Sequence, residues 1–531
     1  MRRILCALIG GSLAVAAPAP AGPRAPAPEK RAAVTATTFF VSGRGWGHGV
    51  GMSQYGALGY AQDGWTYDQI LGHFYTGAEL GPSPVARVRV LVAESRPSLK
   101  IRSAAPFRIR DVFGTMHPFA AGDLVLGPKL RVQVNGTPTE LTGPLVVLPG
   151  SAPLELDRPY RGQLELAVAA GKLSAVNVVG LEQYLAGVVP KEMPSSWPDE
   201  ALKAQAVAAR SYALSHRLAG KGFDLYADVR SQVYGGIAAE HPRTTAAITA
   251  TKGEVLLWEG KPIDALFHST SGGATVDAAE SFGKPVPYLV GVDDPHSDLS
   301  PVHRWGPTPV PETVLRKGLG LRAPVTGLEL TRSPSGRVAR AQVLGAAGAT
   351  TVTGTALRSA AGIRSTWITS LATLSLTRPG GPAVYGRSLV LTGRAANAKG
   401  AVIERRVGTA WQPVSRPGIA PRATAKLLAP ASFRLTAGTL VGPVLKVPVA
   451  PVVTARARGA RTVTGAVRPL EPGTTVELQL DSERGWWTMA KTTTGPDGGY
   501  TLALPEPGRY RARVAPVQGF AEGLSGQFEL S

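Results

Sequence analysis

The sequence predicts an α+β fold in which a β-rich body carries one main helix and is followed by two small all-β modules. Between residues 85 and 170, apolar and polar residues alternate in short runs broken by Gly and Pro, which is typical of strands. Near residues 198–219, apolar residues recur at three- and four-residue spacing, which predicts a helix. After residue 376 the sequence repeats itself at an interval of about 75 residues, the size of a small Ig-like β-sandwich.

Size and charge limit the classes of protein to consider. The chain has 531 residues, too many for one hydrophobic core, so we expect roughly three or four domains. A formal net charge of +20 predicts attraction to anionic wall polymers, peptide carboxylates or lipid surfaces, although a solubilising surface would carry the same charge. Nucleic acid is not expected as a partner, because no nucleic-acid-binding motif is present.

The N-terminus has the three-part layout of a secretory signal peptide. Two arginines precede an apolar stretch from Ile4 to Ala17, and the small residues Ala19-Pro20-Ala21 follow. The stretch is short for a membrane span, although an uncleaved N-terminal anchor would share the pattern. We therefore expect residues 1–21 to be removed, leaving a secreted chain without a stable membrane span.

The remaining boundaries follow from changes in composition. We expect a Pro/Ala-rich linker, a central domain in four parts and two β-sandwich modules, over residues 22–37, 38–375 (38–84, 85–160, 161–305 and 306–375), 376–452 and 453–531. Within the modules, Trp411 and Trp487 are expected to be core residues of matching strands. Trp486 is a candidate for a sugar-stacking surface, with a place in the core as the alternative.

The helix expected near residues 198–219 has suitable capping residues, with Ser196 before it and Gly220 after it. Lys203 and Arg210 lie two turns apart and point the same way. Two parallel cations can hold an anionic or polyhydroxylated ligand, and they can equally be solvated surface charges. Spacing alone leaves both interpretations open.

Residues 43–57, GRGWGHGVGMSQYGA, have glycine at every second position from Gly43 to Gly51. A dinucleotide loop is excluded because G-x-G-x-x-G is absent, and no P-loop motif is present either. In a strand these glycines would leave one surface without side chains. Such a surface lets a ligand approach the backbone, and a tightly packed crossing of two strands would need the same glycines. We call residues 43–57 the glycine motif.

Two further segments carry chemically active groups. Glu192 lies between Pro190 and Pro194, and a carboxyl held rigidly beside apolar residues can have a raised pKa and act as an acid, whereas most loop glutamates are merely solvated. Residues 265–275, ALFHSTSGGAT, place His268 and two hydroxyls at the end of an expected strand. Ser-His catalysis is weakly supported there, because no G-x-S-x-G elbow is present.

Taken together, these segments resemble the SpoIID/LytB family of stage II sporulation proteins D and amidase enhancers. The resemblance spans about residues 38–375 and is carried by the glycine motif and by VVPKEMPSSWPDEALKAQAVAARSYAL, SQVYGG, FHSTSGG and PYLVGVDDP. It implies a β-rich core with one active-site helix and a peptidoglycan lytic transglycosylase in which Glu192 is catalytic. By the same resemblance, the residues expected to bind substrate are Lys203, Arg210, Tyr212, Gln232, His268, Ser269, Ser271, His48, Ser53 and Gln54.

The implied reaction uses a single carboxyl. Protonated Glu192 would donate to the oxygen that joins N-acetylmuramic acid to N-acetylglucosamine in peptide-stripped strands. The resulting carboxylate would then take the proton of the C6 hydroxyl, which closes a 1,6-anhydro ring. Two alternatives remain: a peptidoglycan-binding protein that stimulates a cell-wall amidase, and a structural wall-adhesion protein.

The sequence departs from the family pattern in two ways. In many relatives the GHGVGMSQ string follows the glutamate-bearing core, whereas here it comes first, and residues 327–370 resemble the segment that normally precedes it. This order suggests a circular permutation, so we expect His48 to share a cleft with Glu192 and His268. Some relatives also hold a metal through cysteines. The only cysteine here is Cys6, so we expect no metal and no other cofactor.

Overall fold

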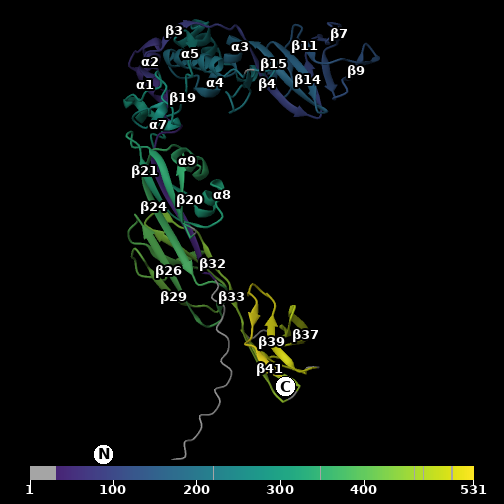
Figure 1. Cartoon of the computed structure of the whole chain (residues 1–531), viewed down its shortest axis with the longest axis vertical. Helices are drawn as coiled ribbons and strands as arrows, with labels where there is room; N and C mark the ends of the chain where they lie inside the picture. Colours follow the sequence, from purple (N-terminus) through teal and green to yellow (C-terminus); the bar gives the residue numbers. More distant parts are fainter. Residues whose placement is uncertain are drawn as a thin grey trace, which may run out of the picture. The chain divides into compact units, whose positions relative to one another are not determined.

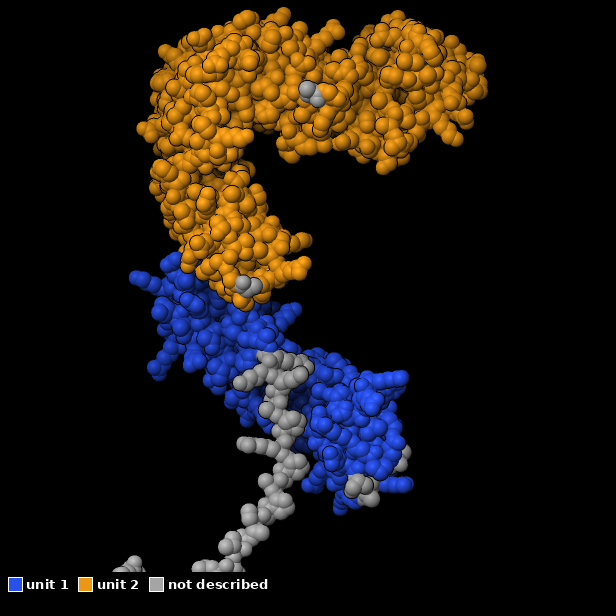
Figure 2. Space-filling model, in the orientation of Figure 1, with its two compact units in different colours: residues 1–38, 373–531 blue, residues 39–372 orange. Residues whose placement is uncertain are grey.

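The structure is a computed structural model that describes residues 32–218, 220–346, 348–459, 461–469, 472–503 and 506–530. The expected signal peptide and residues 22–31 of the expected linker lie outside these ranges. The chain divides into two compact units, which Figure 2 colours separately: unit 2 is residues 39–372, and unit 1 is residues 1–38 with 373–531. All expected site residues belong to unit 2. Within the described ranges, no helix has the length and apolar character needed to cross a membrane.

A β-rich subdomain follows residue 85, as the alternating sequence predicts. Its larger sheet has the order β16 (Leu225–Tyr226), β4 (Arg87–Arg96), β15 (Lys172–Gly180), β14 (Gln163–Ala169), β11 (Leu145–Leu148), β6 (Phe107–Arg110) and β7 (Met116–Phe119). A smaller sheet consists of β13 (Pro159–Tyr160), β12 (Leu154–Glu155), β5 (Leu99–Ser103) and β8 (Gly122–Leu126), and β9 (Arg131–Val134) pairs with β10 (Thr137–Glu140). Ile101 of the smaller sheet and Ile109 and Leu164 of the larger one belong to the same hydrophobic core.

Antiparallel pairing of β14 with β15, from Gln163 opposite Val178 to Ala169 opposite Lys172, extends the larger sheet past the expected boundary at residue 160. The chain then leaves β15 directly into the helical part of unit 2. α3 begins at Leu181, directly after β15, and the next helix, α4, ends at Glu192.

The helical part is built around α5 (Asp199–Ser215), which corresponds to the helix predicted near 198–219. Pro198 rather than Ser196 is its N-cap, and it ends with His216 as C-cap, before Gly220. Helices and a short strand pack around α5: α1 (Gln54–Gln62), α2 (Tyr67–Phe74), α3 (Leu181–Ala186), α4 (Val189–Glu192), α6 (Pro242–Ala250) and β17 (Glu254–Trp258). Figure 1 labels most of these elements in the teal and purple part of the chain. The alanine-rich helix is therefore buried on most of its circumference.

Short elements complete this part of unit 2. β17 pairs with β3 (Glu79–Pro82) and β18 (Lys261–Pro262), and β2 (Met52–Ser53) pairs in parallel with β19 (Phe267–His268). The remaining turns of helix are η1 (Ile237–Ala239), α7 (Ala278–Phe282) and η2 (Pro295–Leu299). The parallel pair joins the glycine motif to the segment of His268, although the two are far apart in sequence.

The last part of unit 2 places the two ends of the unit side by side. It contains β20 (Arg304–Pro311), α8 (Glu312–Gly318), the sheet of β21 (Val325–Arg332), β22 (Val338–Gly345) and β23 (Gly348–Thr353), and α9 (Gly354–Ala361). β1 (Val34–Arg44) lies between β20 and β24 (Ile368–Arg378), and the Arg44 N–H donates to the Trp367 carbonyl oxygen at 3.0 Å. Adjacent ends are what a circularly permuted domain requires. β1 begins at Val34, inside the expected linker.

The described residues of unit 1 form strands and no helix, and their division into two modules stays a prediction from the sequence repeat. The first contains the end of β24, β25 (Ala383–Val384), β26 (Ser388–Ala396), β27 (Val402–Val407), β28 (Ala410–Pro413), β29 (Arg422–Lys426), β30 (Ala431–Ala437), β31 (Leu440–Val441), β32 (Leu445–Val447) and β33 (Val449–Ala450). The second contains β34 (Val452–Ala457), β35 (Thr462–Arg468), β36 (Thr475–Ser482), β37 (Gly485–Thr493), β38 (Gly499–Ala503), β39 (Gly508–Val514), β40 (Gly523–Leu524) and β41 (Phe528–Leu530).

The expected core role of Trp487 is wrong. Its side chain is 58% exposed, and the aromatic residues of the second module's core are Tyr500 and Tyr510. Trp486 lies beneath the guanidinium of Arg511, whose Cζ is 4.1 Å from the ring centroid. Side chains alternate between the two faces of a strand, so the neighbours Trp486 and Trp487 point to opposite faces. The sequence alone does not show which of these two faces packs against the core.

Candidate functional site

Glu192 is the last residue of the one-turn helix α4, which has Pro190 in its first turn. Met193 is extended (φ −132°, ψ 136°), as expected for a residue that precedes a proline, here Pro194. The helix therefore ends at Glu192, whose side chain is half-buried. Burial raises the pKa of this carboxyl. A larger fraction of Glu192 thus carries a proton near neutral pH than for a solvated glutamate, which suits a general acid.

Gln54 links the glycine motif to Glu192. Its Nε2 donates to the backbone carbonyl oxygen of Glu192 at 3.0 Å and to Oε1 of Gln205 at 3.1 Å. Gln54 opens α1 and Gln205 lies within α5, so one buried amide ties α1, α4 and α5 together. The glycine motif therefore lies directly against the segment of Glu192, as its placement in the family pattern led us to expect.

Tyr212 of α5 lies within electrostatic reach of Glu192. Burial, followed by the charges of Asp264 and Glu192, raises the pKa of the Tyr212 hydroxyl. The imidazole of His216 stacks on the Tyr212 ring at a centroid distance of 3.9 Å, and its Nδ1 is 3.6 Å from Oδ1 of Asp264. Sequence reasoning missed Asp264, whose only signal was its position next to residues 265–275. Burial also raises the pKa of the Asp264 carboxyl.

The alternate glycines of the motif leave room for other segments of the same chain to pack closely against it. Gly45, Gly47, Gly49 and Gly51 have φ values of 70°, 121°, 86° and 69°, so the motif is not the regular strand that we expected. A Cβ on Gly51 would lie 2.1 Å from the carbonyl oxygen of Leu266, and one on Gly47 would lie 2.6 Å from Cβ of His268. On Gly49 it would meet the guanidinium carbon of Arg337 at 2.7 Å. Tight packing of the motif against other segments of this chain, not the approach of a ligand, therefore accounts for these glycines.

This packing predicts a graded loss of stability. We expect Gly51→Ala to lower the free energy of unfolding by about 3 kcal/mol, since it combines a positive φ with a backbone clash. Gly64→Ala is the matched control, because Gly64 has φ 87° with no atom within 4 Å of an added Cβ. The control should lose only about 1 kcal/mol in urea unfolding. Equal losses for the two variants would contradict the packing argument.

His48 and His268 lock the glycine motif onto β19. Nδ1 of His48 accepts from the Val50 N–H (3.1 Å), so its Nε2 donates to the carbonyl oxygen of Phe267 (3.1 Å). Nδ1 of His268 donates to the Val50 carbonyl oxygen (3.2 Å), and the two imidazole centroids are 5.4 Å apart. Burial lowers the pKa of His48 to about 4 and that of His268 in the same direction. Both rings are therefore neutral at pH 7 and act in holding the two segments together.

The expected cleft of His48 with His268 and Glu192 is thus partly realised. The rings of His48 and His268 lie together. The residue of the motif that bonds to Glu192, however, is Gln54, while both nitrogens of His48 are engaged with Val50 and Phe267. His268 is only 5% exposed, and its expected role as a substrate contact is wrong.

Ser53 and Ser271 are also wrong as substrate contacts. Both are fully buried, and Oγ of Ser271 donates to Oδ2 of Asp294 at 2.5 Å. Oγ of Ser53 in addition accepts from the Gly56 N–H (3.2 Å) as the N-cap of α1. Asp294, which sequence reasoning quoted within PYLVGVDDP without a role, is the buried acceptor of the Ser271 hydroxyl and lies near Ser53. Burial raises its pKa.

Arg210 and Gln232 are buried as well, which corrects their expected roles. The guanidinium of Arg210 donates to both carboxylate oxygens of Glu182 (3.1 and 2.6 Å) and to the carbonyl oxygen of Glu254 (2.8 Å), with no exposed surface. Gln232 is 3% exposed and accepts from the Tyr184 hydroxyl at 3.2 Å. Neither of the two interpretations left open for Arg210 holds, because α5 has no free face at this position.

Lys203, Tyr212 and Ser269 remain partly accessible. Lys203 pairs with Glu200 at 2.6 Å and lies 5.8 Å from the ring centroid of Tyr67. Oγ of Ser269 lies 3.1 Å from Oγ1 of Thr270, and its carbonyl oxygen accepts from the Tyr55 N–H at 3.1 Å. The candidate active site therefore consists of Glu192 with half-buried neighbours, while most of the expected polar wall is structural.

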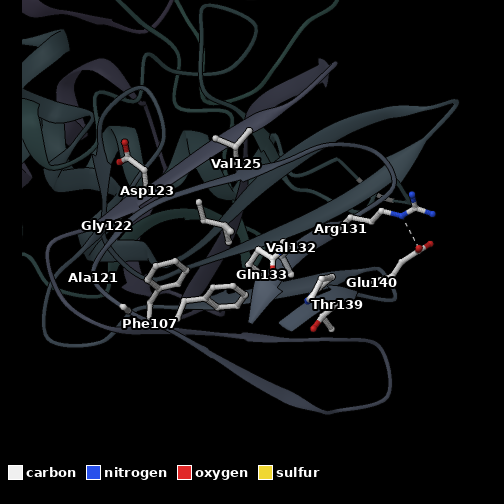
Figure 3. A pocket seen from close by; sticks show the side chains of 14 residues that line it. Phe107, Ala121, Gly122, Asp123, Val125, Arg131, Val132, Gln133, Thr139 and Glu140 are labelled. Carbon is white, nitrogen blue, oxygen red and sulfur yellow. Dashed lines mark hydrogen bonds and ion pairs between the residues drawn. The ribbon is translucent and has the colours of Figure 1, made fainter. Parts of the chain in front are cut away.

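A hollow of about 770 Å³ lies elsewhere in unit 2, in the β-rich subdomain (Figure 3). The rings of Phe107 and Phe119 stack there at 5.4 Å, and Arg131 and Glu140 form an ion pair at 2.9 Å. None of the expected site residues lines it. Its charged side chains are already paired, so it is a poor candidate for catalysis. No group of three or more His, Cys, Asp or Glu residues suitable for a metal occurs in the described ranges.

A family model and several known proteins are similar to this chain, and their names point to the same family. Residues 169–258, which include Glu192 and α5, match the family model of the stage II sporulation protein SpoIID. A stage II sporulation protein D of Bacillus amyloliquefaciens is 32% identical over 228 residues, which are 39% of this chain and 65% of that protein. An amidase enhancer of Bacillus subtilis (strain 168) is 42% identical over 110 residues, 21% of this chain and 15% of that protein. An uncharacterized protein of Brachyspira hyodysenteriae is 40% identical over 136 residues, 25% of this chain and 37% of that protein. The chain thus spans less than two thirds of these relatives.

Proposed function

Since this chain belongs to the SpoIID/LytB family, we propose that it is a secreted, wall-associated peptidoglycan lytic transglycosylase. Its substrate is the glycan strand stripped of peptides, and the bond cleaved joins N-acetylmuramic acid to N-acetylglucosamine. The observation that carries the proposal is the half-buried carboxyl of Glu192, with its raised pKa, at the end of α4. The signal-peptide-like sequence of residues 1–21 supports export. The net charge of +20 favours association with anionic wall polymers.

The chemistry follows from this one carboxyl. Glu192 in its acid form donates its proton to the bridging oxygen as the bond from that oxygen to C1 of the muramoyl sugar breaks. The carboxylate so formed takes the proton of the C6 hydroxyl, and O6 bonds to C1 to close the 1,6-anhydro ring. Both reacting groups belong to one sugar, so the nucleophile needs no second carboxylate to activate a water molecule. Glu192 ends each cycle protonated again.

Three features of the site support these steps. The hydrogen bond from Gln54 holds the backbone of Glu192, which restricts where the carboxyl can lie. Burial raises the pKa of the carboxyl, so at a given pH a larger fraction of it is protonated than of a solvated glutamate. Tyr212 has a raised pKa, so its hydroxyl stays protonated at neutral pH and is available to donate a hydrogen bond to the substrate.

A product analysis tests the proposal. The mature protein is incubated with purified peptide-free glycan strands, and the products are identified by mass spectrometry. We expect fragments that end in 1,6-anhydromuramic acid, which are 18 Da lighter than the corresponding hydrolysis products because no water is consumed. Intact strands, or reducing ends formed by hydrolysis, would contradict the proposal.

The similarity to an amidase enhancer supports a second candidate, a non-catalytic protein that binds peptidoglycan and stimulates a cell-wall amidase. Here the mature protein should increase amidase release of peptides from purified walls, and Glu192→Gln should increase it equally. Stimulation without any 1,6-anhydro product would favour this second function over the first.

A further inference from the structure

Tyr55 lies in the first turn of α1, directly after the residue that bonds to Glu192. Its N–H donates to the carbonyl oxygen of Ser269 at 3.1 Å, while Nε2 of Gln54 donates to the carbonyl oxygen of Glu192 at 3.0 Å. Hydrogen bonds on successive residues thus hold this turn between the segments of Ser269 and Glu192. The Gln54 side chain is buried in doing so, whereas that of Tyr55 stays partly exposed.

Trp197 approaches the same place from the loop between α4 and α5, five residues after Glu192. Its N–H closes a turn on the carbonyl oxygen of Pro194 at 3.1 Å, and Pro198 restricts the backbone on the other side. The ring packs against a small apolar cluster made of Met193, Ala201, Leu202 and Ala247. One part of the indole is therefore anchored in the core, and the rest stays accessible.

The two rings contact each other, Tyr55 next to the residue that bonds to Glu192 and Trp197 against Met193, the residue after Glu192. Their centroids are 4.9 Å apart at an interplanar angle of 66°, an edge-to-face pair. The face of an aromatic ring is electron-rich and attracts the positively polarised C–H groups on the apolar side of a pyranose. From this geometry we propose that Tyr55 and Trp197 form an aromatic wall on which a sugar ring of the glycan strand stacks next to Glu192. The nature of the ligand, an N-acetylated glycan, rests on the proposed function.

The burial of the other candidates strengthens this assignment. Ser53, Ser271, His268 and Arg210 are enclosed in the protein and have little or no surface to offer a sugar. Binding sites for small ligands are lined mainly by apolar and aromatic surface with a few polar groups. Tyr55 and Trp197 supply that aromatic surface on segments that adjoin Glu192, and Tyr212, within electrostatic reach of Glu192, supplies an accessible polar atom.

The test measures binding separately from cleavage. The full mature chain carrying Glu192→Gln, which cannot turn over, is titrated calorimetrically with N-acetylglucosamine hexamer and with peptide-free glycan strands. We expect Tyr55→Ala and Trp197→Ala each to raise Kd at least tenfold. Tyr55→Phe and Trp197→Phe keep an aromatic ring and should stay within threefold of the parent. Phe113→Ala is the control for loss of an exposed ring, since Phe113 is 79% exposed in the β-rich subdomain, and it should leave Kd unchanged.

Each outcome decides the proposal. If the alanine variants have a Kd within threefold of that of the parent, or if the parent binds neither ligand, the proposed aromatic wall is wrong. If Trp197→Ala lowers the midpoint of thermal unfolding, the Kd of Trp197→Leu is used in its place. Leucine keeps the apolar anchor but has no aromatic face. Ring-dependent binding by a wild type that forms no 1,6-anhydro ends upholds the wall and rejects the proposed activity. Formation of 1,6-anhydro ends by the wild type, together with unaltered binding in the alanine variants, overturns the wall and upholds the proposed activity.

Discussion

Replacement of Glu192 by glutamine is expected to abolish formation of 1,6-anhydro ends while the fold and glycan binding persist. Glutamine has nearly the same shape but can neither donate a proton to the glycosidic oxygen nor accept one from the C6 hydroxyl. Positioned acid–base groups contribute factors of about 10²–10⁴, and here one residue performs both transfers. We therefore expect the rate to fall by a factor on the order of 10³ or more, measured by mass spectrometry of products over time.

The same variant separates loss of chemistry from loss of structure. Burial raises the pKa of Glu192 above its value in the unfolded chain, so the ionised carboxylate destabilises the fold. This loss of stability is present above the pKa of the unfolded chain and absent at low pH, where the carboxyl is protonated in both states. Glu192→Gln removes the charge, so at pH 7 the variant should be at least as stable as the wild type. A marked loss of stability at pH 7 would show that the carboxylate is needed structurally.

The pH dependence of the wild type provides a further check. General acid catalysis requires protonated Glu192, so activity should decline as pH rises through the pKa of this group. Because that pKa is raised, the decline should occur at higher pH than for a solvated glutamate. Products that persist unchanged in Glu192→Gln would eliminate the mechanism whatever the pH profile.

Arg210→Met is expected to destabilise unit 2 by about 3 kcal/mol, because it breaks an ion pair whose arginine is fully buried. The substitution leaves Glu182 without its bidentate partner and the carbonyl oxygen of Glu254 without a donor. Methionine fills a similar volume, so the loss reflects the missing hydrogen bonds rather than a cavity. Urea unfolding followed by circular dichroism measures the change.

Lys203→Met is the matched control on the same helix. Lys203 is partly exposed and pairs with Glu200 at the protein surface, where ion pairs contribute only about 0–1 kcal/mol. The control should therefore unfold close to the wild type. If Arg210→Met were as stable as Lys203→Met and lost only glycan binding, Arg210 would be a substrate contact after all and the structural role argued here would be wrong.

The amino-acid sequence by itself determined the local features of this protein. Alternation and turn residues are short-range properties, and they predicted the strands after residue 85 and in unit 1. Periodicity predicted α5 to within a few residues, and the family pattern singled out Glu192 and placed the glycine motif beside it, where Gln54 now bonds. The permutation itself remains a prediction, for which the adjacency of β1 and β24 is the structural condition.

Only the tertiary structure decided which side chains are accessible. Helical spacing shows that Lys203 and Arg210 share a face, but the neighbours that pack around α5 decide that Arg210 is enclosed and Lys203 is not. The glycines likewise signal a close approach, yet only the fold shows that the approaching groups are Leu266, His268 and Arg337 of the same chain. Burial depends on contacts between residues distant in sequence, and so does the pKa of Glu192. That is why the accessible surroundings of the candidate active site emerged from the structure alone.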